Sequence, residues 1–139
     1  MTNLINKNGS IQANNVNNFV LKKGEKLTTA LYLISSFIHT EEPVRGRLRL
    51  LSIEILSFIT QQTISGGDAN EESELCAFVE ELCSLLSVAT LSGYISTMNS
   101  EVLIREYRDL LSIFVNDVGQ HSGSRREQEL SPDFLVVEL

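Results

Sequence analysis

The stretch LTTALYLISSFIHTEEPVRGRLRLLSIEILSF, residues 27–58, decides the fold. Two apolar runs flank the polar segment His39-Thr40-Glu41-Glu42-Pro43, and the second run opens with three arginines at alternate positions. Apolar residues in the first run recur at spacings of three and four, which is typical of one face of an α-helix. This predicted core stripe consists of Leu27, Ala30, Leu31, Ile34, Phe37 and Ile38. Proline suits the first position of a helix because its missing N–H would have no partner there. The stretch therefore predicts a helical hairpin with a charged turn before Pro43.

The second half of this hairpin, which should reach about Thr63, carries two apolar stripes. One stripe consists of Val44, Leu48, Leu51, Ile55, Phe58 and Ile59, and the other consists of Leu50, Ile53 and Leu56. Such a helix is apolar over more than half of its circumference, which exceeds the single stripe that an ordinary surface helix buries. We expect it to be central in a bundle or to lie at a protein interface. Leu50, Ile53 and Leu56 are therefore candidate partner-binding residues.

Helical periodicity continues beyond this hairpin, with interruptions that divide it. Gly66-Gly67 predicts the end of the second helix, and residues 68–71 have the spacing of a capping box at the start of a third. Ser92-Gly93 predicts the end of the third helix or a kink in it. A last helix should start near residues 99–100. These signals predict four helical segments joined by short turns.

The two ends of the chain differ from this helical body. Residues 1–22 contain seven asparagines, which favour turns and compete with helix formation, so we expect a flexible arm. Residues 119–139 lose the helical pattern, and we expect a flexible tail that closes on the short apolar run Phe134–Val137. This run either docks on a partner or packs on its own bundle, which makes Phe134 a further candidate partner-binding residue.

The length and composition suit a single helical domain. A chain of 139 residues can bury a core of its own, and only two prolines interrupt it. We therefore predict an all-α fold. Its body should be an antiparallel four-helix bundle over residues 23–118, with the first helix starting near Gly24.

The charge and the cysteine content limit the partners and the location. The net charge is −7, and all four lysines lie within the first 26 residues. An acidic body argues against sequence-independent nucleic-acid binding, which requires neutralisation of phosphates. The sequence shows no apolar run long enough to span a membrane, no signal peptide, and only two cysteines. We expect a cytoplasmic protein that binds neither nucleic acid nor membranes directly.

Residues that could perform chemistry are few and scattered. His39 and His121 are the only histidines, and neither belongs to a Glu-x-x-His or His-Glu-x-x-His motif. His39 is expected to cap the first helix as a protonated imidazole. Cys76 and Cys83 lie about 10 Å apart along one helix, too far for a disulfide. They are interpreted as buried hydrophobes, with an exposed interface thiol as the alternative. We expect no catalytic residue, metal site or cofactor.

Two pairs of arginines are the basic residues most suited to meeting a partner. Arg45 and Arg49 are four apart on the second helix, and Arg105 and Arg108 are three apart on the last helix. The simpler interpretation is ion pairing with glutamates of neighbouring helices. The alternative is a site for an anion or an acidic partner, because the planar guanidinium binds carboxylate or phosphate through two hydrogen bonds.

Three short segments resemble a group of uncharacterised small bacterial helical-bundle proteins. They are Leu31-Tyr32-Leu33-Ile34, Glu42-Pro43 and the arginine-rich start of the second helix. The likeness covers about residues 20–118. Some members of such groups append a helix-turn-helix domain, for which this sequence shows no counterpart. The resemblance implies a regulatory or assembly role, and it transfers no functional residue.

The sequence favours a non-enzymatic protein–protein interaction or assembly module, which self-associates or joins a larger complex. The second hypothesis is a small regulatory protein that binds an anionic ligand or an acidic partner through Arg45, Arg49, Arg105 and Arg108. The third is an enzyme with a carboxylate or serine site that its motifs do not reveal.

Overall fold

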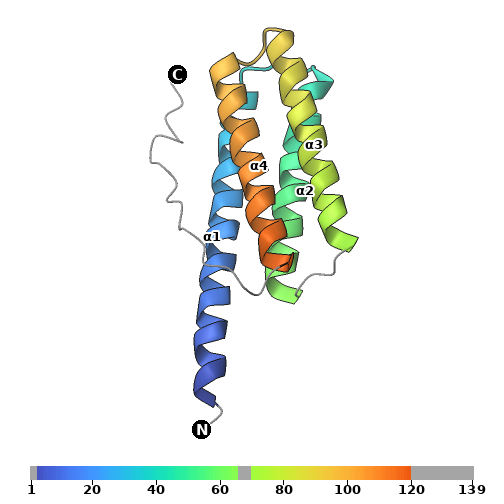
Figure 1. The fold of residues 1–139 in the computed structure, drawn as a ribbon. Coiled ribbons are helices and arrows are strands. Elements are labelled where there is room, and N and C mark those ends of the chain that lie inside the picture. Colours follow the sequence, from blue (N-terminus) through green and yellow to red (C-terminus); the bar gives the residue numbers. More distant parts are fainter. Residues whose placement is uncertain (1–2, 66–69, 120–139) are drawn as a thin grey trace.

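The fold is an all-α four-helix bundle, as predicted. The computed structural model describes residues 3–65 and 70–119, with side chains from residue 18 to 65 and from 71 to 116. The helices are α1 (Asn3–Ser35), α2 (Pro43–Ser65), α3 (Asn70–Leu91) and α4 (Thr97–Gly119). Each of α1 and α3 packs against both α2 and α4, and the N-terminal part of α1 extends past the other helices (Figure 1). The described residues contain no β-strand.

The α1–α2 and α3–α4 connections lie at the same end of the bundle (Figure 1). They are joined there by a hydrogen bond of 2.8 Å, which the hydroxyl of Tyr94 donates to Oε1 of Glu42. The end of α2 and the start of α3 lie at the opposite end, where the amide of Gln62 contacts the carboxylate of Glu71. Pro43 occupies the first position of α2, as its missing N–H predicts.

The end of α3 is a Schellman motif. Gly93 has a φ of +83°, which is the left-handed conformation that glycine adopts without steric cost. Its N–H donates to the carbonyl of Thr90 over 3.0 Å, and the N–H of Tyr94 donates to the carbonyl of Ala89 over 2.9 Å. These bonds satisfy carbonyls that the helix leaves without a partner. The helix therefore ends at the predicted Ser92-Gly93 signal rather than kinking there.

The start of α4 differs slightly from the prediction. The helix begins at Thr97, because the hydroxyl oxygen of Ser96 accepts a hydrogen bond of 3.2 Å from the N–H of Asn99. This is an N-cap, in which a serine side chain satisfies one of the first unpaired N–H groups of a helix. Ser100, which was a candidate for the start, is instead buried and donates to the carbonyl of Leu86 over 3.5 Å.

The first helix is much longer than predicted. It begins at Asn3 rather than near Gly24, so residues 3–22 of the predicted arm are helical. Each asparagine lowers the stability of a helix by less than about 0.7 kcal/mol relative to alanine. In addition, no proline precedes Pro43, so no residue stops a helix that is packed at one end from extending. The predicted tail, including Phe134, lies outside the described residues apart from Gly119, which closes α4.

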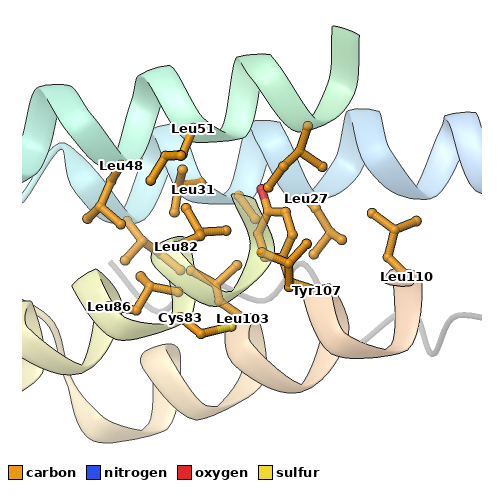
Figure 2. Close-up of a cluster of buried hydrophobic side chains, with 14 of the residues drawn as sticks. Leu27, Leu31, Leu48, Leu51, Leu82, Cys83, Leu86, Leu103, Tyr107 and Leu110 are labelled. Carbon is orange, nitrogen blue, oxygen red and sulfur yellow. The ribbon is translucent and has the colours of Figure 1, made fainter. Parts of the chain in front are cut away.

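The core lies between the four helices and consists mainly of leucine and isoleucine. Figure 2 shows side chains from all four helices converging on it, among them Leu31, Leu51, Leu82, Leu103 and Tyr107. Phe37 was predicted to belong to the core stripe of the first helix, but it is 54% exposed. Because α1 ends at Ser35, Phe37 lies in the following turn and no longer follows the helical period.

Candidate interaction surface

Three sides of α2 are occupied within the bundle. Its core side carries Leu48, Leu51, Ser52, Ile55 and Ile59, all buried. The side toward α1 carries Arg49, which donates to Ser35. The side toward α3 carries Arg47, whose guanidinium lies 2.6 Å from the carboxylate of Glu81. The remaining side faces outward.

The outward side of α2 carries large apolar side chains. Leu50 is 47% exposed and Ile53 is 45% exposed. Ile64, near the end of the same helix, is 82% exposed. The structure therefore brings two of the predicted partner-binding residues together on one open helix face.

Leu56 does not belong to this face. It follows Leu50 by six residues, or about 1.7 helical turns, so it points in a different direction. Its Cδ1 would lie 3.3 Å from a Cβ added at Gly24, so it packs where α1 and α2 approach closely. The predicted second stripe is thus divided between the surface and the contact of α2 with α1.

Arg49 binds the C-terminal end of α1, and Arg45 binds the connection that follows it. The Nη1 of Arg45 donates to the carbonyl of Ile38 over 3.0 Å. Arg49 donates from Nε to the hydroxyl of Ser35 over 2.8 Å and from Nη2 to the carbonyl of Tyr32 over 3.2 Å. Its guanidinium also lies 4.7 Å from the centre of the Tyr32 ring, a cation–π contact.

The interpretation of these two arginines as ion-pair partners is therefore wrong, since neither forms a salt bridge within the described residues. A helix leaves its last carbonyls without intrahelical partners and carries partial negative charge at that end. The sequence pointed to the positive charge, but it did not show that the end of α1 would be the acceptor.

The ion pairs of Arg105 and Arg108 are long. Arg108 lies 3.9 Å from Glu80 of α3, and Arg105 lies 3.8 Å from Glu106 of its own helix. Each of the two arginine side chains is more than half exposed. The two arginine pairs are not brought together, because α2 packs mainly on α1 and α3 whereas these two residues lie on α4.

His39 does not act as the predicted cap. Because α1 ends at Ser35, His39 lies in the connection, and its Nδ1 accepts a hydrogen bond of 3.3 Å from the N–H of Glu41. Arg45 supplies the positive charge that was assigned to this histidine.

The two cysteines have different surroundings. Cys83 is 3% exposed, and burial raises the pKa of its thiol. Cys76 is exposed, so the interpretation as a buried hydrophobe is correct for Cys83 and wrong for Cys76. Because residues seven apart differ by only about 20° around a helix, Cys76 and Cys83 share one face of α3. They differ in position along the axis, since Cys76 lies about two turns nearer the start of α3.

A groove of about 390 Å³ lies at the end of the bundle that carries the two connections. Its lining consists of the apolar residues Ile34, Phe37, Ile95 and Met98 and the polar residues Tyr94, Ser96 and Asn99. Phe37 and Met98 are exposed at its edge. No carboxylate, histidine or cysteine lines this groove.

Sequence reasoning missed a buried lysine. Lys23 of α1 is 2% exposed, and its Nζ lies 3.0 Å from Oε2 of Glu106 and also contacts Asp109, both on α4. Glu106 and Asp109 are three residues apart and so lie on one helix face. This spacing of two acidic residues was the signal in the sequence that indicated a basic partner. Because the first helix was expected to start only near Gly24, no partner helix was assigned to Lys23.

Comparison with protein-family models, curated proteins and solved structures finds no match to this chain. Among the residues that the structure describes, no helix is long and apolar enough to cross a membrane. Within the same residues, no three histidine, cysteine, aspartate or glutamate side chains are grouped so that they could hold a metal ion.

Proposed function

We propose that this protein is a non-enzymatic helical interaction module that takes part in an assembly through the outward face of α2. The observation that carries this proposal is the joint exposure of Leu50 and Ile53 on a helix whose other three sides are occupied. In the assembly this face would be covered by another protein surface.

The energetics support a docking surface at this position. Full burial of a leucine or isoleucine side chain is worth about 1.5–3 kcal/mol, and Leu50 and Ile53 are each nearly half exposed. Ile64 adds a third side chain that is 82% exposed on the same helix. Single exposed apolar residues are ordinary on protein surfaces, whereas several on one face are typical of interaction sites.

Binding of an anionic ligand through Arg45, Arg49, Arg105 and Arg108 has less support. The guanidinium groups of Arg45 and Arg49 already donate to Ile38, Ser35 and Tyr32. A ligand would have to replace these bonds, which complement the end of α1.

The proposal is tested by the size of the complex in extracts of cells that naturally make the protein. We expect the wild-type chain to elute well above its monomer mass of 15.5 kDa in size-exclusion chromatography. The double variant Leu50→Glu, Ile53→Glu should elute as a monomer, because charge would be forced into the interface. Val88→Glu on α3 is the matched control, since Val88 is 51% exposed on another helix. Elution of the wild-type chain at the monomer mass both in the extract and, after purification, at millimolar concentration would overturn the proposal.

A further inference from the structure

The outward face of α2 follows a coiled-coil period. Six of its residues are spaced alternately by four and three positions, and we call them the α2 seam: Gly46, Leu50, Ile53, Ser57, Thr60 and Ile64. A period of 3.5 residues keeps a seam aligned with a second helix over several turns. All of the seam is exposed except Thr60, which is half-buried. The bundle thus presents a helix face with the spacing that another helix would match.

We infer that the α2 seam pairs with the α2 seam of a second copy of this chain, with the two helices running in opposite directions about a two-fold axis between Leu50 and Ile53. This inference rests on the proposed function and names its partner. The two-fold axis sets Leu50 of one copy against Ile53 of the other. It also sets Gly46 against Ser57, so large side chains meet at the centre of the paired part of the seam, residues 46–57, and small ones lie at its two ends. Thr60 and Ile64 lie beyond this part, because the positions opposite them are Pro43, the first residue of α2, and His39 in the connection.

Charge complementarity favours this direction. Arg47 and Glu54 flank the seam on one side and are seven residues apart, which is one full coiled-coil repeat. In the antiparallel pair, Arg47 of each copy lies beside Glu54 of the other. Arg47 also pairs with Glu81, but both side chains are 43% exposed, so its guanidinium can contact a second carboxylate from solvent. A parallel pair would instead direct Glu54 toward Arg49, which is half-buried and held by both Ser35 and Tyr32 of α1.

The space at the seam is compatible with close pairing. A Cβ added at Gly46 would meet no atom within 4 Å, so no other side chain among the described residues covers this part of α2. One helix face supplies only a small contact area. Interfaces below about 1,200 Å² are typical of transient complexes, so we expect a dimer that forms reversibly and depends on protein concentration.

Cysteine cross-linking tests both the surface and the direction. Both test proteins lack the native thiols through Cys76→Ser and Cys83→Ala. One protein then receives Gly46→Cys and the other receives Ser57→Cys. One of the two also bears a tag that changes its mass. After mild oxidation of the mixture, the antiparallel pair predicts mixed dimers joined between positions 46 and 57. Neither protein alone should cross-link well, because identical positions 46 would lie about 16 Å apart along the helices.

The alternative results contradict the inference in different ways. Efficient cross-linking of each protein with itself would show a parallel pair. No cross-linking in any mixture, while the wild-type chain still elutes in a large complex from cell extracts, would show that another protein covers the seam. In that case the inference fails and the proposed function stands. Adding Leu50→Glu to the Gly46→Cys protein should abolish the mixed dimer, whereas Val88→Glu should leave it unchanged.

Discussion

The ammonium group of Lys23 on α1 lies 3.0 Å from Oε2 of Glu106 on α4, although the Lys23 side chain is only 2% exposed. Asp109 is a second partner on the same helix. A buried charge is tolerated only when it is paired, so this contact fixes how α1 and α4 align along each other.

Lys23→Met should lower the free energy of unfolding by about 2–3 kcal/mol. Removing one member of a buried ion pair commonly costs about 3–5 kcal/mol, and the cost is reduced here because Glu106 and Asp109 keep partial contact with water. Urea unfolding followed by circular dichroism gives the value. Lys22→Met is the matched control, since Lys22 is exposed and its replacement should change stability by less than about 0.5 kcal/mol. Equal stability of the two variants would contradict this role of Lys23.

Arg49→Lys should lower the free energy of unfolding by about 1–2 kcal/mol although the charge is kept. A lysine cannot reproduce both the hydrogen bonds to Ser35 and Tyr32 and the contact with the Tyr32 ring. Arg105→Lys serves as the control because Arg105 is 71% exposed. If thermal and urea unfolding of Arg49→Lys match the wild type, the guanidinium geometry at the end of α1 is irrelevant to stability.

The stability of the fold should decrease in alkaline solution through Tyr94. The hydrogen bond to Glu42 raises the pKa of Tyr94 above its ordinary value of 10. A raised folded-state pKa means that the stabilisation is complete below pH 10 and is lost as the pH rises through the folded-state pKa. Tyr94→Phe removes this contribution but retains Tyr107, whose pKa burial also raises. The melting temperatures of the two proteins should therefore converge above pH 10, and a constant difference would contradict the assignment.

The two thiols should differ strongly in reactivity. Cys76 is exposed, whereas Cys83 is buried and its pKa is raised by burial, so little thiolate forms there near neutral pH. We expect one thiol to react rapidly with an aromatic disulfide reagent in the native protein and the second only after unfolding in denaturant. Cys76→Ser should remove the fast phase. Two thiols reacting at similar rates in the native protein would mean that α3 opens readily.

Much of the fold could be predicted because it depends on local signals. The turn at Pro43 and the helix end at Gly93 follow from the backbone restrictions of single residues. The start of α1 could not be predicted in this way. The low helix propensity of asparagine is a weak local effect, and α1 begins at Asn3 in spite of it.

The candidate surface was predicted only in part. The excess of apolar residues on α2 indicated an open stripe, and Leu50 and Ile53 lie on it. Leu56 is instead at the contact with α1, because α1 approaches α2 closely at Gly24. This approach is a tertiary contact, which local sequence patterns do not show. The partners of Arg45 and Arg49 depended on where α1 ends, and that end was expected later in the chain.

The central claim is that α2 pairs with α2 of a second copy, and the molar mass of the purified protein in solution tests it most directly. Sedimentation equilibrium over increasing concentration should show the mass of the wild-type chain rising from 15.5 kDa toward twice that value. Val88→Glu should behave in the same way, whereas Leu50→Glu, Ile53→Glu should stay at the monomer mass. A wild-type mass that remains at 15.5 kDa up to millimolar concentration would contradict the account.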